Sequence, residues 1–508
     1  MRTRPAITYA TLAATTLLVA FLLHYPSLFE PRWYGDEGIF AAVAQNIRHG
    51  ETLYADALDN KPPLIFFTYA AIQSTLGSGV FALHFVATVS VLATQAAVMA
   101  IALRLFGPRR SLAAGLIFAF AMGAPLLEAN LAMTETFMIL PASLAVLAYL
   151  LAARRDERAR TPWYAAAGLL LGIAAGYKQV AVFDGAAIAA MIWITHERPL
   201  RALAPIAAGF ALPQIAFAAL FLASGAFPQY WYAVAGSLRL YAELGPAQSP
   251  FVRFIGFLPA LMACAWLVRR RQLGREVRLS MFPMLWLGFA IAGATSSSFP
   301  FPHYLQQAIP ALALVLVADP LGQEREDVGK IVLAVGGVLV AAVVFGQFAF
   351  AYRERTQLDP IDYYRTFVQH RYGTMSYDDY VRHFDGKAFT VHDIALDIER
   401  DGAGATLYTW SELPWLYADA NLTNPARYYT SFLGEFIPGA KQEILRDLNA
   451  RPPVYIVVSD EAYGPFAELD AFVAARYALI DARNDWRLYR LLTANGRLTP
   501  EGPVVTAR

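Results

Sequence analysis

The chain has 508 residues, of which 57 % are hydrophobic and only 16 % are charged, and its mean hydropathy is +0.40. This composition excludes an ordinary soluble protein, in which about a quarter of the residues are charged, and indicates a membrane protein. The formal net charge of +1 gives no reason to expect a nucleic-acid partner.

Long apolar runs recur through residues 1–352. A helix needs roughly 20 residues to cross a hydrocarbon layer of about 30 Å. On this basis we expect about eleven transmembrane helices, at residues 7–25, 81–104, 111–127, 134–152, 163–176, 179–195, 202–223, 252–268, 280–297, 304–318 and 331–351. The first lacks a small-residue cleavage pattern after it, so it is interpreted as a retained span and not as a signal peptide.

Basic residues set the expected orientation. Most arginines of the membrane part fall in alternate connections, as in "ARRDERAR" and "VRRRQLGREVR", and such connections lie in the cytoplasm. The N-terminus is therefore predicted to be cytoplasmic. An odd number of spans then places the loop 26–80 and everything after residue 352 outside.

Two regions outside the spans carry structure of their own. The loop 26–80 contains "PPLIFFTYAAIQSTL", which predicts a helix lying in the membrane interface. Residues 353–508 have a soluble composition and predict a small α/β domain, following a membrane domain at residues 1–352. The expected strands are 405–410, 426–430, 454–459, 477–481 and 486–492, and the expected helices are 439–450 and 465–476.

Ionisable residues beside a membrane are costly, so each is a candidate functional residue. Those expected at the outer face come from loops far apart in the sequence and form a plausible active site. They are Asp36, Glu37, Arg48, Glu51, Asp56, Asp59, Lys61, Glu128, Glu135, Lys178, Asp184, Arg239, Glu243 and His303.

Four segments carry a family resemblance. "YGDEGIFAAVAQNIRHGETLYADALDNKPPLIFFTYAA", "LEANLAMTETFM", "LGIAAGYKQVAV" and "FPFPHYLQQAIP" occur in this order at the outer ends of the predicted spans. Together they resemble the polytopic C-fold (GT-C) glycosyltransferases of the protein O-mannosyltransferase and aminoarabinose transferase type, which are glycosyltransferase family 39-like. The resemblance covers the membrane part and not the soluble tail.

The resemblance implies roles for three carboxylates. Asp36 would be the general base that takes the proton of the acceptor hydroxyl, and Glu37 would orient a neighbouring group. Glu135 matches the second acidic site of the family, with Glu128 as a nearby rival. Simpler interpretations are that Asp36 caps a helix and that Thr134 caps another helix with Glu135 in its first turn.

The resemblance also implies a site for the carrier phosphate. Lys61 and Lys178 would offset its negative charge, and His303 and Tyr304 would hydrogen-bond the phosphate or the sugar. The alternatives are that Lys61 snorkels to the lipid headgroups, that Lys178 lies in a plain turn, and that His303 and Tyr304 belong to an interfacial aromatic belt.

The resemblance implies an inverting hexosyl- or pentosyltransferase, which we expect at the outer face of a bacterial inner membrane. Its partners would be a polyprenyl-phosphate-linked sugar, an envelope acceptor (lipid, polysaccharide or protein) and membrane lipids. The alternatives are a transporter or flippase of lipid-linked sugars, and a polytopic scaffold. No metal site is predicted, because Cys264 is the only cysteine and the histidines are scattered. The carboxylates still leave Mg²⁺ or Mn²⁺ open.

Overall fold

The structure is a computed structural model. It describes residues 3–123, 125–244, 250–269, 274–297, 299–318, 328–351, 359–402, 406–483, 485–493 and 497–498. The chain divides into two compact units. A helical unit is built from Met1–Leu28, His84–Leu220 and Leu238–Arg365, and a mixed unit from Phe29–Leu83, Phe221–Ser237 and Thr366–Arg508.

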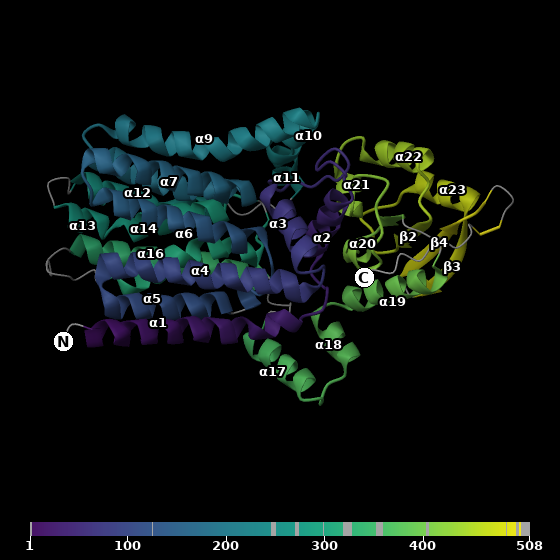
Figure 1. Cartoon of the computed structure of the whole chain (residues 1–508), viewed down its shortest axis with the longest axis horizontal. Coiled ribbons are helices and arrows are strands. Elements are labelled where there is room, and N and C mark those ends of the chain that lie inside the picture. The colour runs from purple at the N-terminus through teal and green to yellow at the C-terminus, as the bar shows by residue number, and fades with distance from the viewer. Residues whose placement is uncertain are drawn as a thin grey trace. The chain divides into compact units, whose positions relative to one another are not determined.

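Long apolar helices make up the helical unit, and Figure 1 shows them side by side with their axes nearly aligned. They are α1 (Thr3–His24), α4 (Val80–Phe106), α5 (Pro108–Gly123), α6 (Thr134–Ala153), α7 (Glu157–Tyr177), α8 (Val182–Thr195), α9 (Pro199–Ala223), α12 (Pro250–Arg269), α14 (Phe282–Ala294), α15 (Ile309–Val317) and α16 (Val328–Ala351). Shorter helices are α11 (Ser237–Leu244) and α13 (Arg275–Leu279). A few residues of α4 and α9 belong to the mixed unit.

Each predicted span coincides with a helix, but the number of spans stays a prediction. Among the described residues, six helices are long and apolar enough to cross a membrane, and three further apolar helices are shorter. The predicted span 304–318 begins as the 3₁₀ helix η5 (Pro302–Ala308) and becomes α-helical only at Ile309. Pro310 contributes to the late start, because it lacks the N–H that an α-helix would need to bond to the carbonyl of Gln306, four residues earlier.

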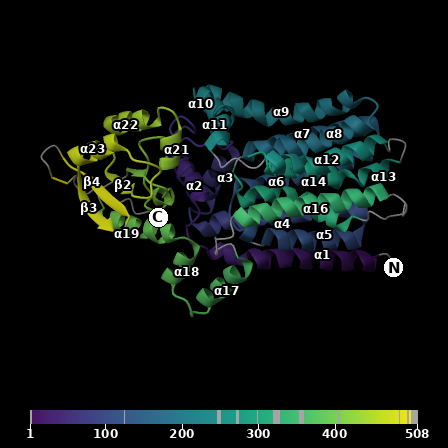
Figure 2. The same ribbon diagram turned by 180° about the vertical axis from the view of Figure 1, so that it is seen from behind.

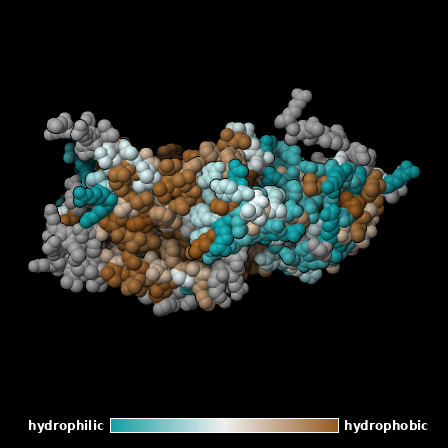
Figure 3. Space-filling view, turned by 90° about the horizontal axis from the view of Figure 1, so that it is seen from below, coloured by the Kyte–Doolittle hydropathy of each residue, from teal (hydrophilic) through white to brown (hydrophobic). Residues whose placement is uncertain are grey.

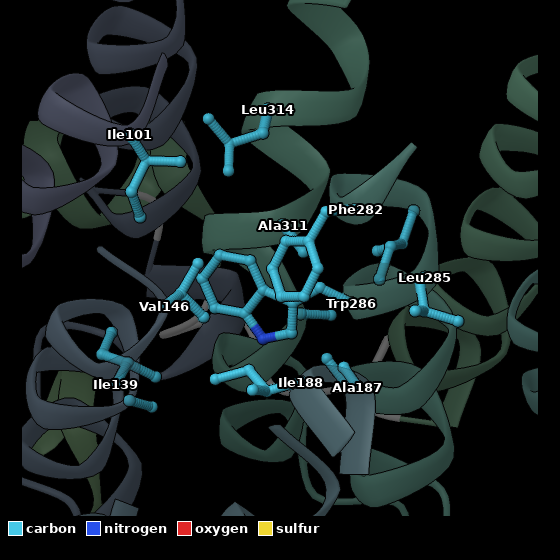
Figure 4. Close-up of a cluster of buried hydrophobic side chains, with 14 of the residues drawn as sticks. Ile101, Ile139, Val146, Ala187, Ile188, Phe282, Leu285, Trp286, Ala311 and Leu314 are labelled. Atoms are coloured by element: carbon cyan, nitrogen blue, oxygen red, sulfur yellow. The ribbon is translucent and has the colours of Figure 1, made fainter. Parts of the chain in front are cut away.

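The core of the helical unit surrounds Trp286 on α14. Figure 4 shows its indole enclosed by aliphatic side chains of α4, α6, α8 and α15. Gly288 lets α12 approach α14 closely, since a Cβ at this glycine would lie 2.2 Å from the backbone nitrogen of Ala260. The face of the unit seen in Figure 3 is largely hydrophobic, which fits contact with lipid.

Segments far apart in the chain form the mixed unit. Its helices are α2 (Gly35–Arg48), α3 (Leu64–Thr75), α10 (Phe227–Trp231), α18 (Tyr377–Phe384), α19 (Gly386–Asp401), α20 (Trp415–Asp419), α21 (Ser431–Phe436), α22 (Ala440–Ala450) and α23 (Ala467–Arg476). A further helix, α17 (Pro360–Arg371), has residues in both units. The helix expected in "PPLIFFTYAAIQSTL" is present as α3.

A four-stranded sheet lies in the C-terminal part of the mixed unit. Its strands are β1 (Leu407–Trp410), β2 (Tyr455–Ser459), β3 (Tyr477–Arg483) and β4 (Trp486–Leu491), in the order β1-β2-β4-β3. β1 pairs with β2 in parallel, and the other two pairings are antiparallel. Figures 1 and 2 show α22 and α23 on one side of this sheet and α19 on the other, which is the predicted α/β layer.

One predicted strand, 426–430, is wrong. The side chain of Asn424 binds the local backbone there, accepting from the N–H of Ala426 at 3.0 Å and donating to the carbonyl of Tyr428 at 2.8 Å. Because these groups are satisfied locally, the segment has no need of a neighbouring strand.

The helix α2 is fixed to the C-terminal segments of the mixed unit. Trp415 donates its indole N–H to the carbonyl of Tyr34 at 2.9 Å, and the amide of Gln45 donates to the carbonyls of Tyr417 and Leu422. Contact is close at Gly38, where a Cβ would lie 2.8 Å from the nitrogen of Trp415. The segment before and within α2 and the C-terminal segments therefore share one folded framework.

Candidate active site

A buried polar cluster lies at one end of the helical unit. Glu135 is in the first turn of α6, Lys178 follows the last residue of α7, and His303 and Tyr304 lie in η5. Glu128 completes it from the short connection before α6. All five side chains are buried, in a unit that is otherwise strongly apolar.

An ion pair joins two of these elements. Lys178 Nζ donates to Glu135 Oε1, and the hydroxyl of Thr134 donates to the other carboxylate oxygen at 2.6 Å. Lys178 Nζ also lies 3.7 Å from the ring centroid of Tyr304, which is cation–π geometry. The ammonium is thus held by a carboxylate and an aromatic face together.

The imidazole of His303 connects both carboxylates of the cluster. Its Nδ1 lies 2.5 Å from Glu128 Oε2, so this nitrogen is the donor to the carboxylate, and its Nε2 lies 4.0 Å from Glu135 Oε1. The ring stacks on Phe301. Both imidazole nitrogens are therefore directed at acidic groups from different segments.

The backbone at Glu128 is locked in an unusual conformation. Its φ is +51°, in the left-handed region that a residue with a Cβ seldom adopts. The amide of Gln306 donates to the carbonyls of Leu127 and Glu128, and its oxygen accepts from Thr136. These bonds hold the turn that aims the Glu128 carboxylate at the imidazole.

A third buried carboxylate lies in the helical unit. Asp184 in the first turn of α8 accepts from the indole N–H of Trp286 at 2.6 Å and from the amide of Gln307 at 2.8 Å. Gln307 also donates to the carbonyl of Val180. From the sequence, Asp184 was predicted only as a charge at the outer face, without hydrogen-bond partners. Its position in the first turn of an apolar helix was the one indication that the carboxylate would need such partners.

The remaining predicted site residues belong to the mixed unit. Glu37 is buried and Asp36 is half-buried, both in the first turn of α2. The helix begins at Gly35 with Tyr34 as its N-cap, so the expectation that Asp36 caps it is wrong. The alternative cap at Thr134 is wrong as well, because Met133 is the N-cap of α6.

Lys61 has nearby acidic and amide partners. Its ammonium lies 3.8 Å from Asp59 and donates to the side-chain oxygen of Asn60 at 3.0 Å. Its backbone N–H also binds Asp59, and its carbonyl accepts from Tyr54. Burial raises the pKa of the Asp59 carboxyl, whereas Lys61 opposes that rise and the charge of Asp36 adds to it.

Asp36 lines a pocket of about 320 Å³ within the mixed unit. The other walls come from the loop before α2 and from C-terminal segments, and include Arg32, Lys387, Glu412 and Trp415. Arg32 pairs with Asp419 and lies over the ring of Trp415. Cations, carboxylates and aromatic faces in one hollow suit a polar ligand such as a sugar.

The structure thus brings Glu135, Lys178, His303 and Tyr304 together in the helical unit, whereas Asp36, Glu37 and Lys61 lie in the mixed unit. Within the described ranges, no group of three or more His, Cys, Asp or Glu side chains is arranged to hold a metal ion. Glu128 was predicted only as a rival to Glu135, and Gln306 was not predicted as a site residue.

Comparison with solved structures identifies the fold. ArnT from Cupriavidus metallidurans bound to undecaprenyl phosphate matches with a TM-score of 0.59 at 15 % identity, over 97 % of this chain and 99 % of that one. Apo ArnT from the same organism matches equally well, with 16 % identity over 96 % and 98 % of the two chains. The chain has a GT-C glycosyltransferase fold.

A family model supports the same resemblance over part of the chain. Residues 60–222 match dolichyl-phosphate-mannose-protein mannosyltransferase. No curated protein matches the sequence. The predicted class, a polytopic helical membrane protein with a C-terminal α/β part, is confirmed.

Proposed function

We propose that the protein is an inverting glycosyltransferase that moves a sugar from a polyprenyl-phosphate carrier to an envelope acceptor. The buried cluster of Glu135, Lys178 and His303 at one end of an ArnT-like bundle carries the proposal, because ionisable groups in such an apolar unit are too costly to be incidental. The undecaprenyl phosphate bound by ArnT and the lipid-linked mannose in the matched family's description support the donor class.

Asp36 is the proposed general base. It accepts no hydrogen bond from any residue that the structure describes, and it lines the pocket of the mixed unit. In the reaction the acceptor oxygen forms a bond to the anomeric carbon while Asp36 takes the hydroxyl proton. The bond from that carbon to the phosphate oxygen breaks, and the electron pair leaves with the polyprenyl phosphate.

Lys178 and Lys61 are the proposed cations for the carrier phosphate. Fixed positive charge stabilises the negative charge that grows on the leaving group in the transition state. Glu135 and Tyr304 hold the Lys178 ammonium in place, and Glu128 does the same for His303. Glu37, buried at the start of α2, would orient the base.

The enzyme is proposed to lie in a bacterial inner membrane with its N-terminus in the cytoplasm. The arginine-rich connections support this orientation. This orientation places the candidate site and the soluble part outside the cytoplasm. The predicted boundary between the membrane part and the soluble part, at residue 352, is not among the described residues. The pocket lined by Asp36 would then take the acceptor.

A transfer assay tests the proposal. Full-length protein in detergent is given polyprenyl-phosphate hexoses and pentoses together with lipid, polysaccharide and protein acceptors, with and without a chelator and added Mg²⁺ or Mn²⁺. We expect sugar transfer, and we expect Asp36→Asn to lower kcat by at least about 10², the usual size of a general-base effect. Asp470→Asn, at an exposed carboxylate on α23 in the same unit, is the matched control and should keep the rate.

The outcomes separate the hypotheses. Wild-type turnover by Asp36→Asn would remove this residue as the base. Movement of the lipid-linked sugar across a vesicle bilayer, without acceptor and without transfer, would favour a transporter.

A further inference from the structure

A second polar hollow lies at the other end of the helical unit, where Ala153 on α6 is about 27 Å from Glu135 at a rise of 1.5 Å per residue. This pocket has a volume of about 390 Å³ and lies where α6 and α8 end and where α7 and α9 begin. Four guanidinium groups line it, and we name it the arginine pocket after Arg160, Arg198, Arg201 and Arg278.

The arginine pocket has a buried, hydrogen-bonded wall. The hydroxyl of Tyr164 lies 3.0 Å from Nε2 of His196, and the other ring nitrogen lies 3.2 Å from the hydroxyl of Thr195. Tyr164 and Tyr149, whose rings stack, are 2 % and 1 % exposed. Basic residues that only set the orientation of a membrane protein do not need buried, hydrogen-bonded side chains beside them. The presence of these side chains is typical of a binding site.

The charges favour an anion. Glu157 and Glu197 also line the pocket, so the four arginines leave a surplus of two positive charges before His196 is counted. The partial positive charges at the N-termini of α7 and α9 are offset by the partial negative charges at the C-termini of α6 and α8, so the surplus of arginines carries the positive charge of the pocket. Guanidinium groups bind phosphate oxygens in pairs, which makes a phosphate group the best-matched ligand.

The surroundings favour a lipid as the source of that phosphate. The helix α9 carries exposed apolar side chains, among them Leu200, Leu212 and Ile215 at 69 %, 59 % and 63 % exposure. Arg198 and Arg201 lie at its start, so acyl chains along α9 would place their headgroup at the pocket. Basic pockets between the ends of transmembrane helices bind anionic headgroups in this way.

We propose that the arginine pocket binds the phosphate of an anionic phospholipid, at a site separate from the one that handles the sugar. A bound lipid would contact the C-terminal ends of α6 and α8 and the N-terminal ends of α7 and α9. Under the proposed orientation the site faces the cytoplasmic leaflet, where anionic lipids give the surface a negative potential.

The test compares lipids on the full-length protein. The delipidated protein in detergent is titrated with phosphatidylglycerol, with phosphatidylcholine of matched chain length, and with sodium phosphate, while bound lipid is counted by native mass spectrometry and Tm is recorded. We expect phosphatidylglycerol alone to be retained and to raise Tm. Arg160→Gln/Arg278→Gln should weaken its apparent affinity at least about tenfold.

Two further variants make the result decisive. Arg104→Gln/Arg109→Gln removes the same charge from exposed positions at the same end of the bundle and should bind like the wild type. If the first variant does not fold, Arg198→Gln/Arg201→Gln, with exposed side chains, should show the same loss. Equal affinity of wild type and pocket variants, or equal retention of phosphatidylcholine, overturns the proposal. A full Tm shift with sodium phosphate overturns the assignment to a lipid.

Discussion

Lys178 and Glu135, which are 43 residues apart in the chain, form an ion pair whose side chains are 11 % and 1 % exposed. Such a pair is destabilising to break, because removal of one partner leaves the other charge buried and unpaired. Removal of both charges is far better tolerated.

The pair should therefore show strong coupling in a double-mutant cycle. Lys178→Met alone should lower the free energy of unfolding by about 3 kcal/mol, and Glu135→Gln alone should also destabilise the protein. The double variant Lys178→Met/Glu135→Gln should lose less stability than the sum of the losses in the two single variants. The difference, which is the coupling energy, should be about 1 kcal/mol or more. Denaturant titration in mixed micelles measures all four proteins; strictly additive effects would contradict the buried pair.

Trp286→Phe should destabilise the helical unit. The change leaves an oxygen of Asp184 without its indole donor and opens space in the packed core, so we expect a loss of about 2–4 kcal/mol. Trp193→Phe is the matched control, since Trp193 on α8 is 57 % exposed and its replacement should change stability by less than about 0.5 kcal/mol. Equal unfolding curves for the two variants would show that the hydrogen bond from the Trp286 indole does not contribute to stability.

Gly288→Ala should weaken the packing of α12 on α14. The new methyl would meet backbone atoms of Ala260, which cannot move aside as a flexible side chain could. We expect a loss of about 1–3 kcal/mol, measured by unfolding in detergent. Gly346→Ala on α16, where nothing lies within 4 Å of the new methyl, should instead be neutral or slightly stabilising.

Glu412 should make stability depend on pH. Burial raises the pKa of its carboxyl above the ordinary value of 4.5, although hydrogen bonds from Ser431 and Phe432 oppose the rise. The folded state therefore binds the proton more tightly than the unfolded state. The resulting stabilisation is present below pH 4.5 and is lost as pH rises through the raised pKa.

Glu412→Gln isolates this effect, because an amide oxygen still accepts the same two hydrogen bonds but does not titrate. The variant should gain stability relative to the wild type as pH rises from 4.5 to 7. Thermal unfolding of both proteins across this range is the measurement. A difference between them that stays constant with pH would rule out a raised pKa.

Hydropathy was enough to place the helices because burying apolar length in lipid dominates their formation. The antiparallel order of α6 and α7 also made it reasonable to expect Glu135 and Lys178 at the same end. Contacts that depend on the conformation of a single residue could not be predicted from hydropathy or helix order. The approach of Glu128 to His303 requires a positive φ, and the failed strand at 426–430 depends on the rotamer of Asn424.

The mixed unit was the least predictable part, since three separate segments form it. Local sequence patterns in the first outer loop and in the tail report helices and strands, but not that Trp415 would bind the carbonyl of Tyr34. Long-range pairing of this kind depends on complementary shape, which residue spacing does not encode.

The attachment of α2 to residues 415–422 also has a consequence for biogenesis. The helix carrying Asp36 leaves the ribosome early, yet the groups that bind Gln45 and cover Gly38 are made almost 380 residues later. Nascent and prematurely terminated chains therefore insert their apolar helices without this support. The helix that bears the proposed base therefore reaches its final contacts only after residues 415–422 have been made.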